Sequence, residues 1–351
     1  MRNIAVLLLA ALPAAASDVT TKFETVKVAE GIYAFIAPEP KSGLVNGNVV
    51  AVIGDDGVLV VDTGQIPSLA KRMLAVIRTK TDKPVRYVVN THWHWDHNLA
   101  NHVFRDAYPN VAIVSTAFTR QGLVDWTPPF QDFLRNSGEK MIESLKKARD
   151  NAPSADQKEA LTDQIDDFES GLPEVRQAVF VAPNQTFDKE MTVYLGKRAV
   201  RIFHPGRANT AGDAVVYVPD AKVLITGDVV VYPTPYATHA YFNDWIGVMK
   251  TLAAMDAAAI VPGHGPIQRD KRYLQQLTAL LESLVTQVQQ AVAQGLTLEE
   301  TKKKVDLSAL RAQFTSGNRR RERAFDDYFV AAAVTDAWKQ AKGEPTSEAP
   351  F

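Results

Sequence analysis

The chain has 351 residues, of which 46% are hydrophobic and 23% are charged, and its formal net charge is −1. These values are ordinary for a globular protein, and so small a net charge excludes a broad basic surface for nucleic acid or an anionic membrane. Cysteine is absent, which excludes disulfides, an acylated N-terminal cysteine and any metal site with a thiolate ligand.

The first 16 residues have the layout of a secretory signal peptide. Arg2 supplies the positive end, Ile4–Leu12 the apolar core, and Ala14–Ala16 a small-residue cleavage site. The apolar run is too short to cross a bilayer as a helix. We therefore expect residues 1–16 to be cleaved and the mature protein to be periplasmic or secreted, a buried N-terminal helix being the alternative.

From about residue 22 to residue 64, short apolar runs alternate with turns, which is typical of β-strands. The expected strands are Glu24–Val28, Ile32–Ala37, Asn48–Ile53 and Val58–Asp62. Residues 54–57, Gly-Asp-Asp-Gly, predict a tight hairpin between the last two strands. A helix is expected over Ser68–Thr79, and the apolar run Val85–Val89 indicates a buried strand.

The most informative segment follows that strand and reads His92-Trp93-His94-Trp95-Asp96-His97. A loop of this kind can aim three imidazoles and a carboxylate at one point. Neutral imidazole and carboxylate suit zinc, and suit iron or manganese less specifically. We therefore predict a metal site at the end of this strand. We expect the two tryptophans to pack beneath the site and fix the loop.

Residues 119–176 differ from the strand-rich segments around them. Pro128-Pro129 predicts the end of one element, and two amphipathic helices are expected to follow it. The second helix opens with a capping pattern at Ser154 and Gln157. We interpret this segment as a helical insertion over the metal cleft. Further strands are expected at Val111–Ser115, Thr192–Leu195, Ala199–His204, Ala214–Val218 and Val223–Thr226.

After residue 266 the sequence becomes helical. Leucine and valine recur at helical spacing over Leu274–Val288, and Thr297 with Glu300 predicts a capping box at the start of a further helix. A last helix is expected over residues 322–342. Its large apolar side chains are interpreted as core packing rather than a cofactor or lipid site; they are Phe325, Tyr328, Phe329 and Val334.

Two basic runs lie in this C-terminal region, Lys302–Lys304 and Arg319–Arg321. Both sit among acidic and helical neighbours. We interpret them as solvated helix faces rather than as a site for a polyanion.

The motif of residues 92–97, His-x-His-x-Asp-His, resembles the signature of the metallo-β-lactamase superfamily. Leu224–Asp228 resembles the strand end that carries this family's bridging carboxylate, and Ile260–Gly265 resembles the strand end that carries its last histidine. Val58–Gly64 is similar to the family's early strand. Together these motifs are far more specific than each alone, and the resemblance covers about residues 22–267.

The resemblance implies an α/β fold, a four-layer αββα sandwich with a helical insertion and a C-terminal helical extension. The signal peptide would occupy residues 1–16 and the metallo-β-lactamase-like domain residues 17–267, with the insertion at 119–176. The C-terminal extension would occupy residues 268–351.

The resemblance also implies two neighbouring metal sites that share a bridging Asp228. Site one would use His92, His94 and a third histidine, whereas site two would use Asp96, His97 and His264. Asp62 would not bind the metal but would orient a ligand. Site two is therefore complete in this sequence.

Site one departs from the family pattern because Asn209 stands where the third histidine would be, and an amide oxygen is a poor zinc ligand beside imidazole. Asn209 could still bind the metal or a water molecule, His204 or His239 could replace the missing ligand, or site one could be loosely held. We favour loose occupancy and expect one or two zinc ions.

These features indicate a metal-dependent hydrolase acting on a small-molecule substrate, with no nucleic-acid partner and no membrane insertion. The substrate would carry a polarisable carbonyl, as in a β-lactam, lactone, ester or thioester. Asp96 or Asp228 would serve as the catalytic carboxylate. Tyr232 and Tyr236 lie in a loop expected to border the substrate, where a tyrosine could donate a hydrogen bond to an oxyanion.

Two alternatives remain. An iron-dependent redox enzyme of the same fold is one of them, although the histidine replaced by Asn209 counts against it. The other is a non-catalytic envelope protein that binds a metal or a ligand for a partner.

Overall fold

The computed structural model describes residues 22–39 and 45–349. The expected signal peptide, residues 1–16, lies outside the described residues. Within the described ranges, no helix is both long enough and apolar enough to cross a membrane.

The first of two sheets has seven strands whose spatial order follows the chain. They are β1 (Glu24–Ala29), β2 (Ile32–Ile36), β3 (Val49–Ile53), β4 (Val58–Val61), β5 (Val85–Val89), β6 (Ala112–Thr116) and β7 (Gln185–Phe187). Strands β1 to β4 pair antiparallel, and β4 to β7 pair parallel. The hairpin expected at residues 54–57 joins β3 to β4, with a hydrogen bond of 2.9 Å from Gly54 N to Gly57 O.

The second sheet has five strands in the order β12-β11-β10-β9-β8. They are β8 (Glu190–Leu195), β9 (Arg198–Phe203), β10 (Val215–Val218), β11 (Val223–Ile225) and β12 (Ala259–Val261). Strands β11 and β12 pair parallel, so their carboxyl ends meet at one edge of the sheet.

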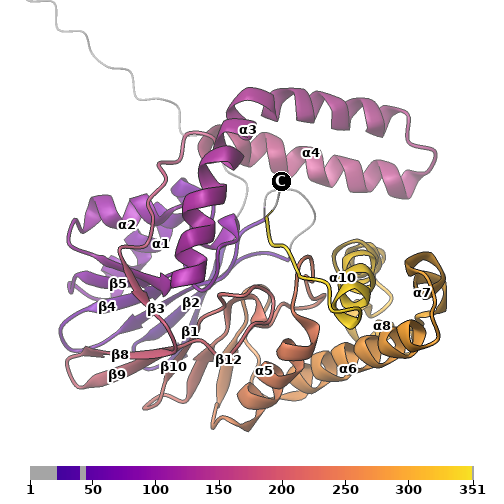
Figure 1. Cartoon of the computed structure of the whole chain (residues 1–351). Helices are drawn as coiled ribbons and strands as arrows, with labels where there is room; N and C mark the ends of the chain where they lie inside the picture. Colours follow the sequence, from indigo (N-terminus) through magenta and orange to yellow (C-terminus); the bar gives the residue numbers. More distant parts are fainter. Residues whose placement is uncertain (1–21, 40–44, 350–351) are drawn as a thin grey trace, which may run out of the picture.

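Helices cover the outer face of each sheet, as Figure 1 shows. Helices α1 (Pro67–Lys80) and α2 (Asn101–Ala107) lie on the first sheet, and α5 (Phe242–Ala254) and α6 (Arg272–Ala293) lie on the second. Three separate apolar clusters fill the spaces between these four layers. Successive side chains of a strand point to opposite faces of the sheet and so belong to different clusters. In β4, Val60 faces the α1 layer, whereas Leu59 and Val61 face the other sheet. The expected αββα sandwich is confirmed.

Helices α3 (Ala117–Asp150) and α4 (Ala155–Val175) form the insertion. Ser154 caps α4 by accepting from Gln157 N, as expected. The prediction that Pro128-Pro129 ends an element is wrong, because α3 continues through both prolines. Each proline removes one helical hydrogen bond and bends a helix, and Figure 1 shows α3 changing direction before it runs beside α4. Packing along α4 therefore outweighs the local helix-breaking tendency.

The C-terminal extension continues from α6 through α7 (Leu298–Lys304), α8 (Ser308–Thr315), α9 (Arg319–Ala324), a π-helical turn (Phe325–Val330) and α10 (Ala331–Ala341). The capping box of Thr297 and Glu300 is present. Phe325, Phe329 and Val334 are buried as expected, but Tyr328 is 37% exposed. The π-helical turn holds more residues per turn than an α-helix, which rotates Tyr328 away from the face that 3.6-residue spacing predicts.

Arg319–Arg321 lie in α9, a helix without a buried residue, as expected for a solvated helix face. Arg320 forms ion pairs of 2.9 Å with both Glu159 and Asp163 of α4, and Arg321 pairs with Glu39. The contacts of Arg320 tie the C-terminal extension to the insertion. Lys302–Lys304 also lie exposed, in the last turn of α7.

Candidate metal centre

The candidate ligands all follow strand ends. Residues 92–97 follow β5 and end in a short 3-10 helix, Trp95–His97. Asp228 lies in a second 3-10 turn, Gly227–Val229, directly after β11, and His264 follows β12. Because these three strands end at the same side of the sandwich, loops from both sheets converge there.

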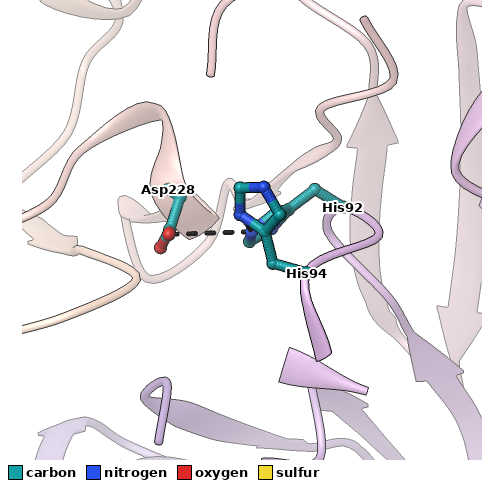
Figure 2. Close-up of side chains that lie close together, drawn as sticks. All are labelled: His92, His94 and Asp228. Carbon is teal, nitrogen blue, oxygen red and sulfur yellow. Dashed lines mark hydrogen bonds and ion pairs between the residues drawn. The ribbon is translucent and has the colours of Figure 1, made fainter. Parts of the chain in front are cut away.

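His92, His94 and Asp228 form one cluster, and Figure 2 shows the aspartate pointing towards the two imidazoles. His92 Nε2 lies 2.9 Å from His94 Nδ1 and 3.6 Å from Asp228 Oδ2. This is the set expected for site one without its third histidine.

Asp96, His97 and His264 form a second cluster beside the first. Asp96 Oδ2 lies 3.2 Å from His97 Nε2 and 3.0 Å from His264 Nε2. The other oxygen of Asp228, Oδ1, lies 3.2 Å from His97 Nε2 and 3.6 Å from His264 Nε2. Asp228 therefore directs one carboxylate oxygen at each cluster.

The residues fit a metal ion. Tetrahedral zinc with bonds of about 2.0 to 2.1 Å separates its ligand atoms by about 3.3 Å, and the atoms here are 2.9 to 3.6 Å apart. Asp228 Oδ1 is buried and makes no well-aligned hydrogen bond. A buried carboxylate oxygen among imidazole nitrogens is stabilised by a cation.

Burial sets the protonation of the first cluster. It lowers the pKa of His92 well below its ordinary value and that of His94 to about 4, so both rings are neutral and able to bind metal. For Asp96 and Asp228, burial alone would raise the pKa, but the neighbouring His97 and His264 lower it below the ordinary value.

Nearby carboxylates favour the protonated form of His97 in the second cluster. Burial would lower its pKa, but the carboxylates of Asp96, Asp228 and Asp62 raise it well above the ordinary value. The same negative surroundings that hold a proton on His97 would hold a metal cation, which competes with that proton.

Asp62 fixes His97 and the start of the metal-binding loop. Its Oδ2 lies 2.9 Å from His97 Nδ1, and it accepts hydrogen bonds of 2.8 Å from Thr91 N and Thr91 Oγ1. Asp62 has a φ of 58°, a left-handed conformation that Asp and Asn tolerate better than most residues. Because Asp62 occupies Nδ1 of His97, the other ring nitrogen, Nε2, is directed at the second cluster.

We expect Asp62→Asn to weaken metal binding by about 10- to 100-fold, because the amide offers one acceptor oxygen where the carboxylate offers two. The backbone conformation is compatible with asparagine, so the fold should persist. Zinc affinity of the metal-free protein, measured with a competing chelator, checks this. An unchanged affinity would mean that Asp62 does not orient His97.

Asn209 lies on the His94 side of the centre. Its Nδ2 donates a hydrogen bond of 2.7 Å to Tyr236 O, and the Tyr236 ring packs edge-on against His94 with centroids 5.4 Å apart. The amide oxygen, Oδ1, is buried with no hydrogen-bond partner among the described residues. That acceptor is therefore available to a metal ion or a water molecule.

The two substitute histidines are held elsewhere. His204 Nδ1 lies 2.7 Å from Asp213 O, and the His239 backbone donates to Asp336. Neither belongs to a metal-binding cluster among the described residues. The ring of Tyr232 packs on Tyr273, while its backbone N–H donates to His264 O. Tyr236 is thus the tyrosine of that loop beside the clusters.

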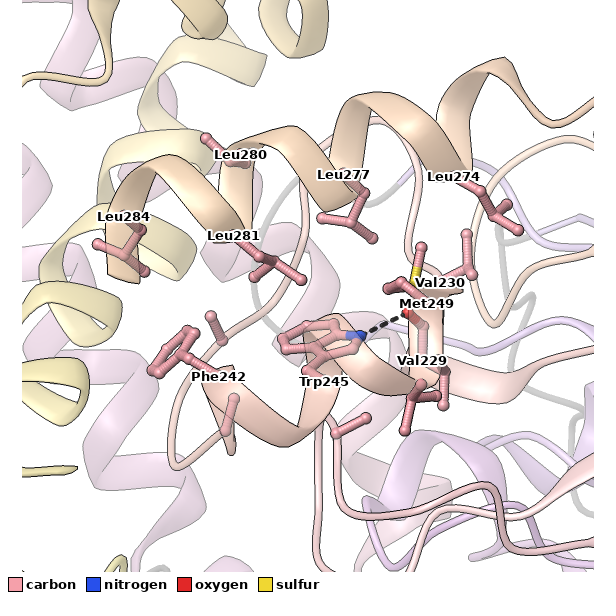
Figure 3. Packing of buried hydrophobic residues seen from close by; sticks show 14 of the residues in the cluster. Val229, Val230, Phe242, Trp245, Met249, Leu274, Leu277, Leu280, Leu281 and Leu284 are labelled. Carbon is pink, nitrogen blue, oxygen red and sulfur yellow. Dashed lines mark hydrogen bonds between the residues drawn. The ribbon is translucent and has the colours of Figure 1, made fainter. Parts of the chain in front are cut away.

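The segment that carries Asp228 is anchored from the α5–α6 layer. Trp245 of α5 is fully buried, and its Nε1 donates a hydrogen bond of 3.0 Å to Val229 O, the residue after Asp228. Figure 3 shows the indole beneath Leu277 and Leu281 of α6. Packing of this helical layer therefore holds the bridging carboxylate in place.

Sequence reasoning missed three residues that shape the site. A Cβ at Gly263 would lie 1.9 Å from Asp228 Oδ1, and one at Gly47 would lie 2.3 Å from the His97 ring, so both positions require glycine. Asn48 donates through Nδ2 to Pro262 O and Gly265 O, which fixes the loop around His264. The Asn-Gly-Asn run before β3 was the available signal, since such residues mark structured loops.

A sandwich of two helix-covered sheets with a double cluster of His and Asp at its strand ends defines a class of metal-binding α/β proteins. A family model described as the metallo-beta-lactamase superfamily matches residues 42–264. The chain belongs to the metallo-beta-lactamase superfamily.

Among curated proteins, the chain is similar to a linear primary-alkylsulfatase of Pseudomonas sp., with 26% identity over 276 residues. The match covers 74% of this chain and 50% of the relative. The chain therefore spans about half the length of the curated relative it matches.

Among solved structures, a metallo-beta-lactamase from Pontibacter korlensis matches with a TM-score of 0.50 and 21% identity, covering 74% of this chain and 99% of that chain. A stereoselective inverting sec-alkylsulfatase from Pseudomonas sp. matches with a TM-score of 0.65 and 16% identity, covering 93% of this chain and 51% of that chain. At these identities the likeness shows the fold alone.

Proposed function

We propose that this protein is a zinc-dependent hydrolase of a small molecule with a polarisable carbonyl group, such as a β-lactam, lactone, ester or thioester. One observation carries the proposal: the two oxygens of Asp228 face two separate ligand clusters, at 3.6 Å from His92 Nε2 and 3.2 Å from His97 Nε2. A carboxylate shared in this way suits two adjacent divalent ions.

Bound zinc polarises a carbonyl oxygen and lowers the pKa of a water molecule towards neutrality. The chain itself keeps His92 and His94 neutral through burial. Among the two carboxylates that face the clusters, the side chain of Asp96 is 14% exposed and that of Asp228 is 5% exposed. We therefore assign to Asp96 the acceptance of a proton from the attacking water, and to Asp228 the bridging role.

Tyr236 is suited to stabilise a developing oxyanion. Burial raises the pKa of its phenol, which keeps the hydroxyl protonated and able to donate a hydrogen bond. Its ring lies against His94, which places the tyrosine beside the first cluster.

Asn209→His is expected to raise the zinc content of the purified protein towards two ions and to increase hydrolysis several-fold. Imidazole is a better zinc donor than an amide oxygen, and the free Oδ1 of Asn209 is the position it would replace. Elemental analysis and an ester assay measure both effects. Asn243→His, at an exposed position of α5, is the control; equal behaviour of the two variants would contradict the assignment.

A second candidate is hydrolysis of a sulfate ester. The curated relative is named as an alkylsulfatase. The sec-alkylsulfatase structure covers 93% of this chain, against 74% for the lactamase from Pontibacter korlensis. A match to 93% of the chain must include part of the C-terminal extension, whereas a match to 74% of the chain need not include any of it.

One set of assays separates the candidates. The chelator-stripped protein is reconstituted with zinc or with iron and given a p-nitrophenyl ester, a chromogenic cephalosporin and dodecyl sulfate. Zinc-dependent cleavage of the ester or the cephalosporin supports the first proposal, and release of sulfate supports the second. Turnover with iron alone would show that iron, rather than zinc, is the active metal. No turnover with either metal would favour a binding protein. Export to the periplasm, proposed from residues 1–16, is tested by N-terminal sequencing of the secreted form.

A further inference from the structure

We propose that Glu348, in the tail after the last helix, is a positioning residue for the first metal cluster. The inference rests on the proposed metal centre, but it concerns how the chain builds that centre rather than which substrate it cleaves.

Glu348 joins two segments that are distant in sequence. Its Oε2 accepts a hydrogen bond of 2.8 Å from Trp93 Nε1, and its Oε1 accepts one of 2.7 Å from Ala211 N. Trp93 stands between the candidate ligands His92 and His94. Ala211 lies two residues after Asn209. One carboxylate thus holds both of the segments that border the first cluster.

Glu348 is unusually buried for a carboxylate. A carboxylate is costly to bury without hydrogen-bond donors. Glu348 is only 4% exposed. Trp93, Ala211 and Tyr241 supply donors that offset part of the cost of this burial.

Trp93 transmits the contact to the cluster. Its ring packs edge-on against His94 with centroids 4.4 Å apart, and against Trp126 of α3 with centroids 4.6 Å apart. The indole therefore has His94 on one side and the helical insertion on another. With its N–H held by Glu348, the indole keeps the orientation in which it packs against His94.

The second cluster has a different support. His97 is oriented by Asp62, and the His264 loop is fixed by Asn48. Loss of the Glu348 contacts should therefore affect the first cluster selectively, and this selectivity distinguishes positioning from a general effect on folding.

The test is a cobalt(II) titration of the metal-free full-length protein, followed by visible absorption. In Glu348→Gln one of the two buried N–H donors loses its acceptor, because an amide has a single oxygen. We expect the affinity for the more weakly bound ion to fall about tenfold, with the more tightly bound ion unaffected. Glu344→Gln, in the same tail but half-exposed, should titrate like the wild type.

Trp93→Phe removes the donor of the same hydrogen bond and leaves the tail unchanged. The test therefore stays valid if Glu348→Gln folds poorly. We expect the same selective loss, and a loss in the double variant that is smaller than the sum of the two, because both variants remove the same hydrogen bond. The proposal is overturned if either single variant binds both ions like the wild type, if both affinities fall equally, or if the two losses add. Because no substrate is involved, a failure of the proposed hydrolase activity leaves this result unaffected.

Discussion

Asp228→Asn is expected to remove metal from both clusters and to lower hydrolysis by about a thousandfold. The amide keeps the shape of the side chain, but it removes the negative charge and replaces one oxygen, whereas each cluster is faced by a different carboxylate oxygen. Loss of several kcal/mol of transition-state stabilisation corresponds to about this factor. Elemental analysis and the ester assay provide the measurement.

The matched control is Asp220→Asn, at the exposed turn between β10 and β11, where the carboxylate pairs with Arg198. An exposed ion pair contributes little, so metal content and activity should stay at the wild-type level. A full complement of zinc in Asp228→Asn would show that Asp228 does not hold metal.

Gly263→Ala is expected to abolish metal binding and to destabilise the fold by about 1 to 3 kcal/mol. The added Cβ would lie 1.9 Å from Asp228 Oδ1 and 2.7 Å from the Gly227 carbonyl carbon, so both the carboxylate and the backbone would have to move. Zinc analysis and denaturant unfolding of the metal-free protein measure the two effects separately.

Gly247→Ala is a control for which we expect the opposite effect on stability. Gly247 lies in α5, and a Cβ there meets no atom within 4 Å. Replacing an exposed helical glycine with alanine should raise stability by about 0.5 to 1 kcal/mol. If Gly263→Ala were as stable and as rich in metal as Gly247→Ala, the close packing around Asp228 would be unimportant.

The sequence was most informative where candidate ligands and a clearly predicted strand occur in the same segment. Residues 92–97 place several ligands directly after a strong apolar strand, and no long-range information is needed to see that they converge. The αββα fold, inferred from the resemblance, is confirmed by two sheets that are each covered by helices.

Sequence reasoning failed where distant segments decide the structure. Pro128-Pro129 is a helix-breaking signal that packing against α4 overrides. Tyr328 is exposed because a π-helical turn changes the phase of the helix. Glu348 meets Trp93 across 255 positions, and no spacing rule connects them. Such contacts follow from the completed fold rather than from any local pattern.

The sharing of Asp228 also determines how the electrical sign of the centre changes with loading. Asp62, Asp96 and Asp228 bring three negative charges to the neutral imidazoles. As long as a metal-bound water molecule keeps its protons, a single divalent ion would leave the whole group net negative, whereas a second ion would make it net positive. Only the centre with two ions would then attract an anionic molecule. The metal affinity of the first cluster, beside Asn209, would therefore decide whether the protein favours an anionic or a cationic substrate.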